Sequence, residues 1–546
     1  MASIIRYWHT LRHLRPVQLY GRIWFRFARP RVDKRAAPRL RARTGAWVEP
    51  VPKHQTLLTP ATARFLSVTR AIDSAAIWND SACEKLWLYN LHYFDELTSV
   101  NAADRSAWQE QLIDRWVAQN PPALGNGWEP YPTSLRLVNW IKWHMAGNEL
   151  SFGAVQSLAV QTRWLAKRVE HHLLANHLFV NAKALIVAGL FFDSREESRE
   201  ADEWLAQGMR ILQRELPEQI LPDGGHFERS PMYHAIILED VLDLINCANA
   251  WPGRIDASTS DQLRATAAAM VKFLDGLTHP DGEIAFFNDA AFGIAPPLAQ
   301  LVAYCARLGI ASRATDQSSE NLRVFRPSGY IRAHAGNAVL LADVAPVGAH
   351  YQPGHAHADT LSFELSLHGH RVIVNSGTST YVAGSLRTFQ RSTAAHNTLE
   401  VNNADSSEVW GGFRVARRAR VIECTASQTD HEIEIIAAHD GYTRLAGAPI
   451  HRRQWRLVEN ELTITDSIRG DFSSAVARVY FHPTVKRRCA ESVQLPSGES
   501  LSFDLRGGTA RIEAASWHPE FGVESGSLCL ICEMSAPEMT LQLRWT

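Results

Sequence analysis

The chain has 546 residues, of which 46% are hydrophobic and 21% charged, with 56 Lys and Arg against 57 Asp and Glu. This composition excludes a disordered tail, a collagen, a coiled coil and a small disulfide scaffold. A single core rarely grows beyond about 250 to 300 residues, so we expect two domains. A formal net charge of −1 gives no overall attraction to nucleic acid, so none is expected as a partner and any polyanion must bind a local cluster.

Three features of the sequence bear on the cellular compartment of the protein. The seven cysteines are scattered and odd in number, which argues against a disulfide framework and favours a reducing environment. No apolar run approaches the ~18 residues of a membrane span, and Arg and His interrupt the amino terminus where a secretory signal needs an apolar centre. The sequence predicts a cytoplasmic or inner-membrane-associated protein without an evident signal peptide, with a periplasmic location as the alternative.

The amino-terminal segment is basic and aromatic. Residues 1–45 hold twelve Lys and Arg and one acid, Asp33, with Tyr, Trp and Phe interspersed. Such a pattern permits an amphipathic helix. We expect residues 1–84 to pack on the body of the protein; the alternative is that residues 1–45 contact a membrane surface or a partner.

Residues 85–325 show helical periodicity. Apolar residues recur at spacings of three and four, and Gly, Pro and Asp mark the joints. Thr133 and Ser230 stand where each can cap the helix that follows. The pattern predicts a run of antiparallel helix hairpins. The expected helices cover residues 104–119, 133–146, 151–171, 174–190, 196–215, 230–249, 260–277 and 297–308.

Residues 326–546 change to a period of two. Short runs such as 361–367 and 461–466 alternate apolar and polar residues between Gly, Asn and Asp turns. This pattern predicts a large antiparallel β-sandwich. Helices followed by strands predict two domains, and ligand sites favour the interface between domains.

Several polar residues interrupt these patterns. Asn176 and His177 lie in an apolar helical segment, where an unpaired buried amide or imidazole costs about 1 to 3 kcal/mol. They are either site residues or satisfied packing groups. Tyr233 follows a Gly- and Pro-rich loop at the start of a helix, where its phenol either points into a cleft or packs at the edge of the core.

A histidine cluster follows in the strand half. His355, His357 and Asp359 alternate, so an extended segment would project all three to one face. His396 adds a third imidazole beside another strand. Three His and one carboxylate form a plausible zinc set if the fold brings His396 close; the alternative is a group of surface polar residues on a turn.

Five short motifs occur in order along the chain: ANH at 175–177, SPMYH at 230–234, HAHADTLSFEL at 355–365, SGTSTY at 376–381 and AHNTLEV at 395–401. This order resembles the heparinase II/III-like polysaccharide lyases. The resemblance implies an incomplete (α/α) toroid followed by a large antiparallel β-sandwich. It also implies cleavage of an acidic, uronate-containing polysaccharide by β-elimination.

The resemblance also implies roles for individual residues. β-Elimination removes the proton alpha to the uronate carboxylate and expels the oxygen on carbon 4, so donors on that carboxylate stabilise the intermediate. Asn176 matches the neutralising Asn and His177 the adjacent active-site His. Tyr233 matches the catalytic acid and base, although a phenol of ordinary pKa ~10 needs cationic or donor neighbours to act as a base. His355 matches a second base or a substrate ligand.

A structural zinc ion accompanies the fold in some members of that family. Its ligand positions correspond to His357, Asn375 and His396, and Asn375 replaces an Asp. An amide is a poor zinc ligand beside a carboxylate, so an expected Zn²⁺ would depend on Asp359 taking its place. No other cofactor is expected.

Aromatic and Arg side chains are candidates for binding the substrate, because aromatic faces stack on sugars and Arg pairs with carboxylate or sulfate. Packing between helices is the alternative. The chain lacks a dense Lys and Arg array in this region, which favours a glycan with little or no sulfate. The candidates are Trp128, Tyr131, Arg136, Tyr381, Arg387 and Arg391.

Two other functions compete with a lyase. An inverting glycoside hydrolase on the same toroid would use two carboxylates about 6.5 to 9.5 Å apart, and Glu129, Asp223 and Glu228 are candidates. A non-catalytic glycan-binding or polysaccharide-assembly protein could also keep the fold. A lyase is the function that the sequence favours.

Overall fold

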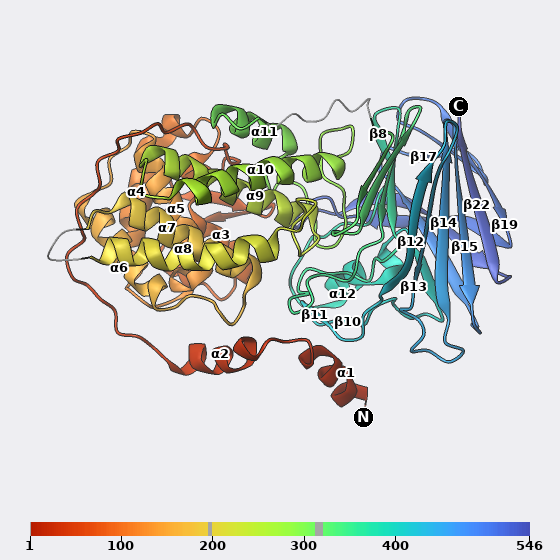
Figure 1. The fold of residues 1–546 in the computed structure, drawn as a ribbon, viewed down its shortest axis with the longest axis horizontal. Coiled ribbons are helices and arrows are strands. Elements are labelled where there is room, and N and C mark those ends of the chain that lie inside the picture. Colours follow the sequence, from red (N-terminus) through yellow and green to blue (C-terminus); the bar gives the residue numbers. More distant parts are fainter. Residues whose placement is uncertain (1, 195–198, 312–319) are drawn as a thin grey trace.

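A computed structural model describes residues 2–194, 199–311 and 320–546, the side chains from residue 4 onward. A helical domain and a strand domain lie side by side along the long axis (Figure 1). The expected helix at 196–215 falls partly outside the described residues. The helices of the first domain are α3 (Lys85–Tyr93), α4 (Ser106–Gln119), α5 (Pro130–Met145), α6 (Phe152–Ala166), α7 (Ala175–Phe191), α8 (Glu200–Gln219), α9 (Pro231–Ala250), α10 (Ala257–Gly276) and α11 (Leu298–Arg307).

Helix α7 lies at the centre of the helical domain. It is apolar on every side, and a helix of that kind must be enclosed by other helices. It packs against α5, α8 and α9, and His177 is its only residue that is not buried. The one side chain of α7 that reaches the surface is therefore one of the predicted site residues.

The two predicted caps differ. Ser230 is the N-cap of α9 and accepts a hydrogen bond from the backbone N–H of Tyr233 at 3.2 Å, as the sequence predicts. Thr133 is not a cap, because α5 begins three residues earlier with Glu129 as its N-cap. Pro130 at the first helical position lacks the N–H that would need a partner, which favours this earlier start.

The second domain is a sandwich of two antiparallel sheets. One sheet has the order β12-β13-β14-β15-β22-β19-β18-β17 and the other β20-β21-β16-β8-β7-β6-β5-β4, with β9 paired to β16. Strands such as β14 alternate buried and partly exposed residues, and the buried ones, including Trp455, fill the space between the sheets. The strands are β4 (Leu322–Phe325), β5 (Tyr330–Ala335), β6 (Ala338–Asp343), β7 (Phe363–Leu367), β8 (His370–Ile373), β9 (Leu399–Val401), β12 (Val421–Gln428), β13 (Ile433–His439), β14 (Ile450–Val458), β15 (Glu461–Arg469), β16 (Ala475–Phe481), β17 (Lys486–Arg487), β18 (Ser492–Gln494), β19 (Ser500–Arg506), β20 (Gly508–Trp517), β21 (Ser525–Met534) and β22 (Glu538–Trp545).

The domains share an apolar contact. Phe273 and Phe287 of the helical half pack with Tyr330 and Leu341 of the β4–β6 edge. Helix α12 (Ser385–Arg391) and the short hairpin β10 (Val409–Trp410) and β11 (Arg414–Val415) flank this junction (Figure 1). A helical toroid followed by an antiparallel sandwich, the fold that the sequence predicts, is confirmed.

The amino-terminal segment forms two helices and a small sheet. Helices α1 (Ala2–Leu11) and α2 (Pro16–Phe27) lie along one edge of the molecule, below both domains in Figure 1. The chain then runs around the helical domain, where the Arg41 N–H donates to the carbonyl of Phe191. In the described ranges, no helix has the length and apolar character needed to cross a membrane. The small sheet comprises β1 (Leu57–Thr59), β2 (Thr62–Phe65) and β3 (Val68–Ala71).

Candidate active site at the domain junction

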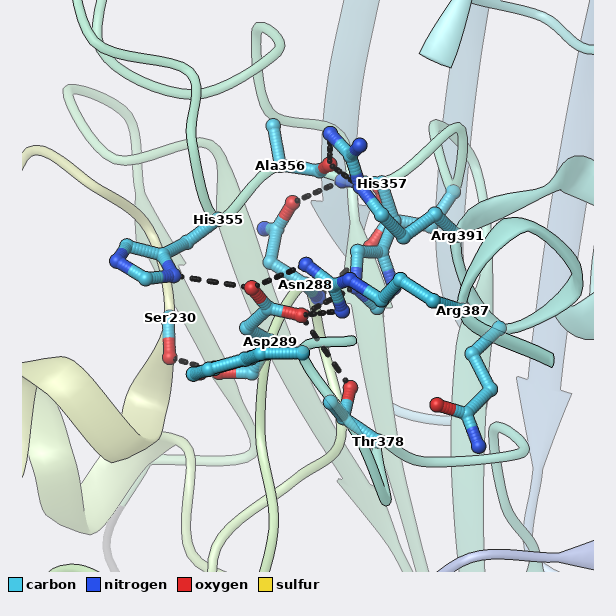
Figure 2. Close-up of polar contacts among 12 residues, drawn as sticks. Ser230, Asn288, Asp289, His355, Ala356, His357, Thr378, Arg387 and Arg391 are labelled. Carbon is cyan, nitrogen blue, oxygen red and sulfur yellow. Dashed lines mark hydrogen bonds and ion pairs between the residues drawn. The ribbon is translucent and has the colours of Figure 1, made fainter. Parts of the chain in front are cut away.

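Asp289 is the centre of a buried polar network at the junction (Figure 2). Its carboxylate accepts hydrogen bonds from Nδ1 of His355 at 2.9 Å and Nε2 of His357 at 2.8 Å, and it forms a two-pronged ion pair with Arg387. Burial opposes ionisation, but Arg387 and the two imidazoles outweigh it and hold the pKa of Asp289 well below its usual range. The carboxylate is therefore a fixed negative charge that orients both His rings.

His355 and Tyr233 join the two domains. The ring of Tyr233, from α9, stacks on the imidazole of His355 with a centroid separation of 3.8 Å. Its hydroxyl lies 3.2 Å from that of Tyr381, which comes from the sandwich domain. All three side chains are half-buried, and burial raises the pKa of Tyr233 well above its usual value. Tyr233 is thus a neutral phenol that can donate a proton.

Glu228 links Asn176 to His355. Its carboxyl accepts the backbone N–H of Asn176 at 3.2 Å and lies 3.5 Å from the side-chain Nδ2. The same group lies 3.6 Å from Nε2 of His355. Burial raises the pKa of Glu228, although His355 opposes the shift. Asn176 Oδ1 is buried and has no hydrogen-bond partner among the described residues.

His177 forms a second group beside Asn176. Its Nδ1 lies 3.2 Å from a carboxylate oxygen of Glu170, and the centroid of its ring lies 4.6 Å from the centroid of the Tyr131 ring. Burial would lower the pKa of His177, but Glu170 outweighs it and raises that pKa. Glu170 is held by Asn181, one turn further along α7, through hydrogen bonds in both directions. Tyr131 and His177 are half-buried, so both can meet a ligand.

The backbone is strained next to these residues. Leu174, directly before α7, has φ 63° and ψ −156°, a conformation found almost only in Gly. Arg229 follows Glu228 with φ 59°, and Asn288 precedes Asp289 with φ 57°. Positive φ is uncommon for residues such as Leu and Arg, whereas Asn adopts it more readily, and strained positions cluster at functional sites.

A candidate metal site lies behind His355. Ligand atoms of His357, Asp359 and His396 lie within 4.8 Å of one another, and all three residues are buried. Nδ1 of His357 is 3.2 Å from Nε2 of His396, while Nδ1 of His396 has no described partner. Two imidazoles and a carboxylate are donors that suit zinc, so the residues fit the ion. The amide of Asn375, the other predicted ligand position, donates to the Phe286 carbonyl and accepts the Asn397 N–H.

Two family models match the two domains of this chain. Residues 92–299 match the model of the heparinase II/III N-terminus, and residues 317–546 match that of the heparinase II/III-like C-terminal region. The chain belongs to the heparinase II/III-like family.

Individual members of this family show how far the likeness extends. A heparin-sulfate lyase of Bacteroides stercoris is 27% identical over 248 residues, 42% of this chain and 36% of that protein. The FtsZ-localized protein C of Caulobacter vibrioides is 24% identical over 369 residues, 62% of this chain and 60% of that protein. The chain thus spans less than two thirds of the length of either relative.

Solved structures of heparinases share the fold. The crystal structure of heparinase III has a TM-score of 0.69 at 17% identity and covers 86% of this chain and 79% of its own. That of the heparan sulfate lyase from Pedobacter heparinus has a TM-score of 0.59 at 17% identity and covers 97% and 87%. At this identity the likeness establishes the fold alone.

Within this heparinase-like fold, four predicted substrate-binding residues are buried and bonded internally. Arg136 donates to Gln161 and to backbone carbonyls, and Trp128 donates its indole N–H to the Asn120 carbonyl. Arg387 is paired with Asp289, and Arg391 donates to the carbonyls of Ala356 and Gly411. These four side chains are therefore bonded within the protein, and their contact with substrate stays a prediction. Their donors are needed to satisfy buried carbonyls and carboxylates.

Asp289 was missed by the sequence reasoning, and Glu228 was considered only as a hydrolase carboxylate. Asp289 stands in a loop between helix and strand regions, in the run FNDAAF, where no periodicity marks it. The only signal would have been an acid flanked by Asn, a pair that suits a tight polar turn. The His355–Asp359 run lies in a loop outside any strand, and it directs His355 and His357 to one carboxylate.

Proposed function

We propose that this protein is a polysaccharide lyase that cleaves a uronate-containing polysaccharide by β-elimination. One observation carries the proposal. Asn176, Glu228 and Tyr233 of the toroid converge on His355 of the sandwich, with contacts of 3.2 to 3.8 Å linking each to the next. This set supplies donors for a carboxylate together with a base and an acid.

The donors would stabilise the charge that develops on the substrate. Removal of the proton on carbon 5 places negative charge on the uronate carboxylate. The Asn176 amide donates one hydrogen bond there, and Glu228, whose pKa burial raises, donates another in its protonated form. Because both groups are buried and held in place, they need little reorganisation when the charge forms.

His355 and Tyr233 would move the protons. Asp289 accepts the Nδ1 proton of His355, which leaves Nε2 free to take the proton from carbon 5. Electrons from that C–H bond form the double bond between carbons 4 and 5 as the bond from carbon 4 to the glycosidic oxygen breaks. Tyr233, a neutral phenol, then donates its proton to the leaving oxygen. The product is an unsaturated uronate and a new hydroxyl end.

The internal pairing of the arginines bears on the substrate. Arg136, Arg387 and Arg391 are buried and satisfied within the protein, so they offer no site for sulfate groups. Tyr131 and Tyr381 are half-buried beside the proposed catalytic groups and can stack on sugar rings. We therefore propose a carboxylated polysaccharide with little or no sulfate.

A divalent metal such as zinc would have a structural role. His357, Asp359 and His396 would hold it and so tie the His355 loop to the segment before β9. The ion would cross-link loops that otherwise depend on hydrogen bonds. Metal analysis of protein purified without chelator should give about one zinc per chain, and His396→Ala should abolish it. Absence of metal from the native protein would contradict this role.

The lyase itself is tested by its product. A panel of uronate polymers should include one on which the protein generates new near-ultraviolet absorbance from the unsaturated sugar. Tyr233→Phe should abolish that signal while binding of the same polymer persists. Reducing ends without absorbance would indicate a hydrolase, and binding without either product would indicate a glycan-binding protein.

A further inference from the structure

Helices α1 and α2 carry an apolar face that no part of the described chain covers. On α2, Tyr20, Ile23, Trp24 and Phe27 follow the three-and-four spacing of one helix face, and Trp24 and Phe27 are 73% and 76% exposed. A patch of large aromatic and aliphatic side chains of this kind marks an interaction surface. Ile4, Trp8 and Leu11 of α1 are also exposed, with the same spacing.

The opposite face of α2 fixes the helix to the protein. Gln18 is fully buried and donates to the carbonyl of Tyr351, and the ring of Phe25 lies 4.2 Å from that of His172. At Gly21, a Cβ atom would lie 2.9 Å from Cβ of His172, so the helix approaches the toroid closely. These contacts leave α2 one orientation, with Trp24 and Phe27 outward.

Helix α1 is fixed in the same way to the other domain. The ring of Tyr7 packs edge-on against Trp410 at 4.9 Å, and the indole N–H of Trp410 donates to the hydroxyl of Thr10. Trp410 belongs to the β10–β11 hairpin of the sandwich half. Both helices lie on the same edge of the molecule (Figure 1), and their exposed apolar side chains are together called the α1–α2 surface.

The charge carried by α1 and α2 themselves is of one sign. Residues 1–45 contain twelve Lys and Arg and a single acid, Asp33, which is paired with Arg35. Arg6, Arg22 and Arg26 are exposed on the helices themselves. A second copy of the chain would bring two such basic surfaces together without acids on these helices to offset them. An anionic surface, by contrast, complements both the charge and the aromatic face.

We propose that α1 and α2 attach the protein peripherally to an anionic lipid bilayer. Trp, Tyr, Phe and Ile side chains on the outer face would enter the interfacial region, and the Arg side chains would contact lipid phosphates. The same helices contact His172, two residues from Glu170, and Tyr351, four residues from His355. The bilayer would therefore lie next to two loops of the candidate active site.

Sedimentation of the full-length protein with lipid vesicles tests this proposal. Vesicles of equal parts phosphatidylcholine and phosphatidylglycerol should bind the protein, and vesicles of phosphatidylcholine alone should bind it far less. The triple variant Ile23→Ser, Trp24→Ser, Phe27→Ser should lose about 100-fold in partitioning. Arg22→Gln with Arg26→Gln should lose about 25-fold, or about fivefold per charge, and added salt should reduce binding by the wild type.

A matched control distinguishes vesicle binding through this face from nonspecific binding by any exposed apolar side chain. Phe152, at the start of α6, is 87% exposed and lies outside the α1–α2 surface, so Phe152→Ser should bind vesicles like the wild type. All these side chains are exposed, and the variants should keep the wild-type melting temperature. Equal binding to both vesicle types, or no loss in the triple variant, would overturn the proposal. A wild-type dimer that the triple variant converts to a monomer would also overturn it, because the face would then be a self-association surface.

Discussion

Two clusters of buried charged residues in this protein have similar chemistry, but they differ in whether they connect to partly exposed side chains. One lies in the core of the toroid, where Lys183 of α7 donates to Asp240 and Asp243 of α9 at 2.6 and 2.5 Å. The other is the junction cluster around Asp289 and Arg387. Opposite charges outweigh the cost of burial at one carboxylate of each cluster, holding the pKa of Asp243 at about 2 and that of Asp289 well below its usual range, whereas burial prevails at Asp240 and raises its pKa.

The difference lies in exposure. The four central groups of the toroid cluster are enclosed: Lys142 and Lys183 meet Asp240 and Asp243 from neighbouring helices, and the side chains of all four are at most 6% exposed. The junction cluster leads outward, since Asp289 holds His355, whose ring stacks on half-buried Tyr233. A perturbed pKa therefore does not distinguish a site from a structural ion-pair network, whereas a connection to partly exposed acid and base groups does.

The largest expected effect is on kcat, and it should arise from a substitution in the junction cluster but not from the same substitution in the toroid cluster. Tyr233→Phe removes the proposed acid and should lower kcat by about 10² to 10⁴-fold with little change in melting temperature. Tyr304→Phe makes the same chemical change in the toroid cluster, where the hydroxyl donates to Asp243 at 3.1 Å. It should lower stability and leave kcat unchanged. Product absorbance and thermal unfolding of both variants provide the comparison, which would fail if Tyr304→Phe also abolished turnover of the folded protein.

The second prediction compares how substitutions in the toroid cluster and in the junction cluster change stability and activity. Lys183→Met leaves Asp240 and Asp243 short of a buried partner and should lower the free energy of unfolding by about 3 to 5 kcal/mol. Activity per folded molecule should persist. Arg387→Met deprives Asp289 of its partner in the same way, but it should reduce both stability and activity because Asp289 positions His355. Urea unfolding with rates corrected for the folded fraction checks both variants; equal loss of activity in the two would remove the distinction.

The same contrast explains what could be predicted from the sequence. Periodicity fixes a helix when its apolar face is continuous, so the expected helix at 174–190 matches α7 almost residue for residue. The sandwich follows from alternation in the same way. His177 was noticed because it interrupts an apolar run, and interruptions of a pattern are visible in the sequence itself. Roles in catalysis and metal binding remain predictions for all of the residues proposed.

The direction in which an Arg side chain points is not a local property. Arg136 and Arg387 stand in sequence settings that would suit anion binding, yet each is fully buried because carbonyls or a carboxylate from distant segments surround it. Asp289 could not be recognised because its partners lie 66 to 98 residues away along the chain. Long-range pairing of buried charges is decided by tertiary packing, which hydrophobic periodicity does not report.

A smaller effect concerns the neutralisation of substrate charge. Asn176→Ala removes the amide donor and should lower kcat/KM by about 10² to 10³-fold. Asn181→Ala is the matched change on α7: it frees Glu170 but removes no proposed donor to the carboxylate, so its effect should be smaller. Steady-state rates on one polymer distinguish the two. If Asn181→Ala were the more damaging variant, orientation of His177 through Glu170 would matter more than donation by Asn176.

The smallest effect follows from the pKa of Glu228. Burial raises that pKa above the ordinary value of 4.5, so the folded protein binds this proton more tightly than the unfolded chain does. Its stabilising contribution is complete below about pH 4.5 and is lost as the pH rises through the folded pKa, by about 1.4 kcal/mol for each pH unit that separates the folded from the unfolded pKa. Glu228→Gln cannot titrate, so its free energy of unfolding should improve relative to the wild type as the pH rises from about 5 through the neutral range. Because the Gln amide still donates a hydrogen bond, kcat/KM should fall by no more than about tenfold. Denaturant unfolding across this range checks the prediction, and a constant difference between the two proteins would show that Glu228 titrates normally and is an ionised carboxylate rather than a proton donor at neutral pH.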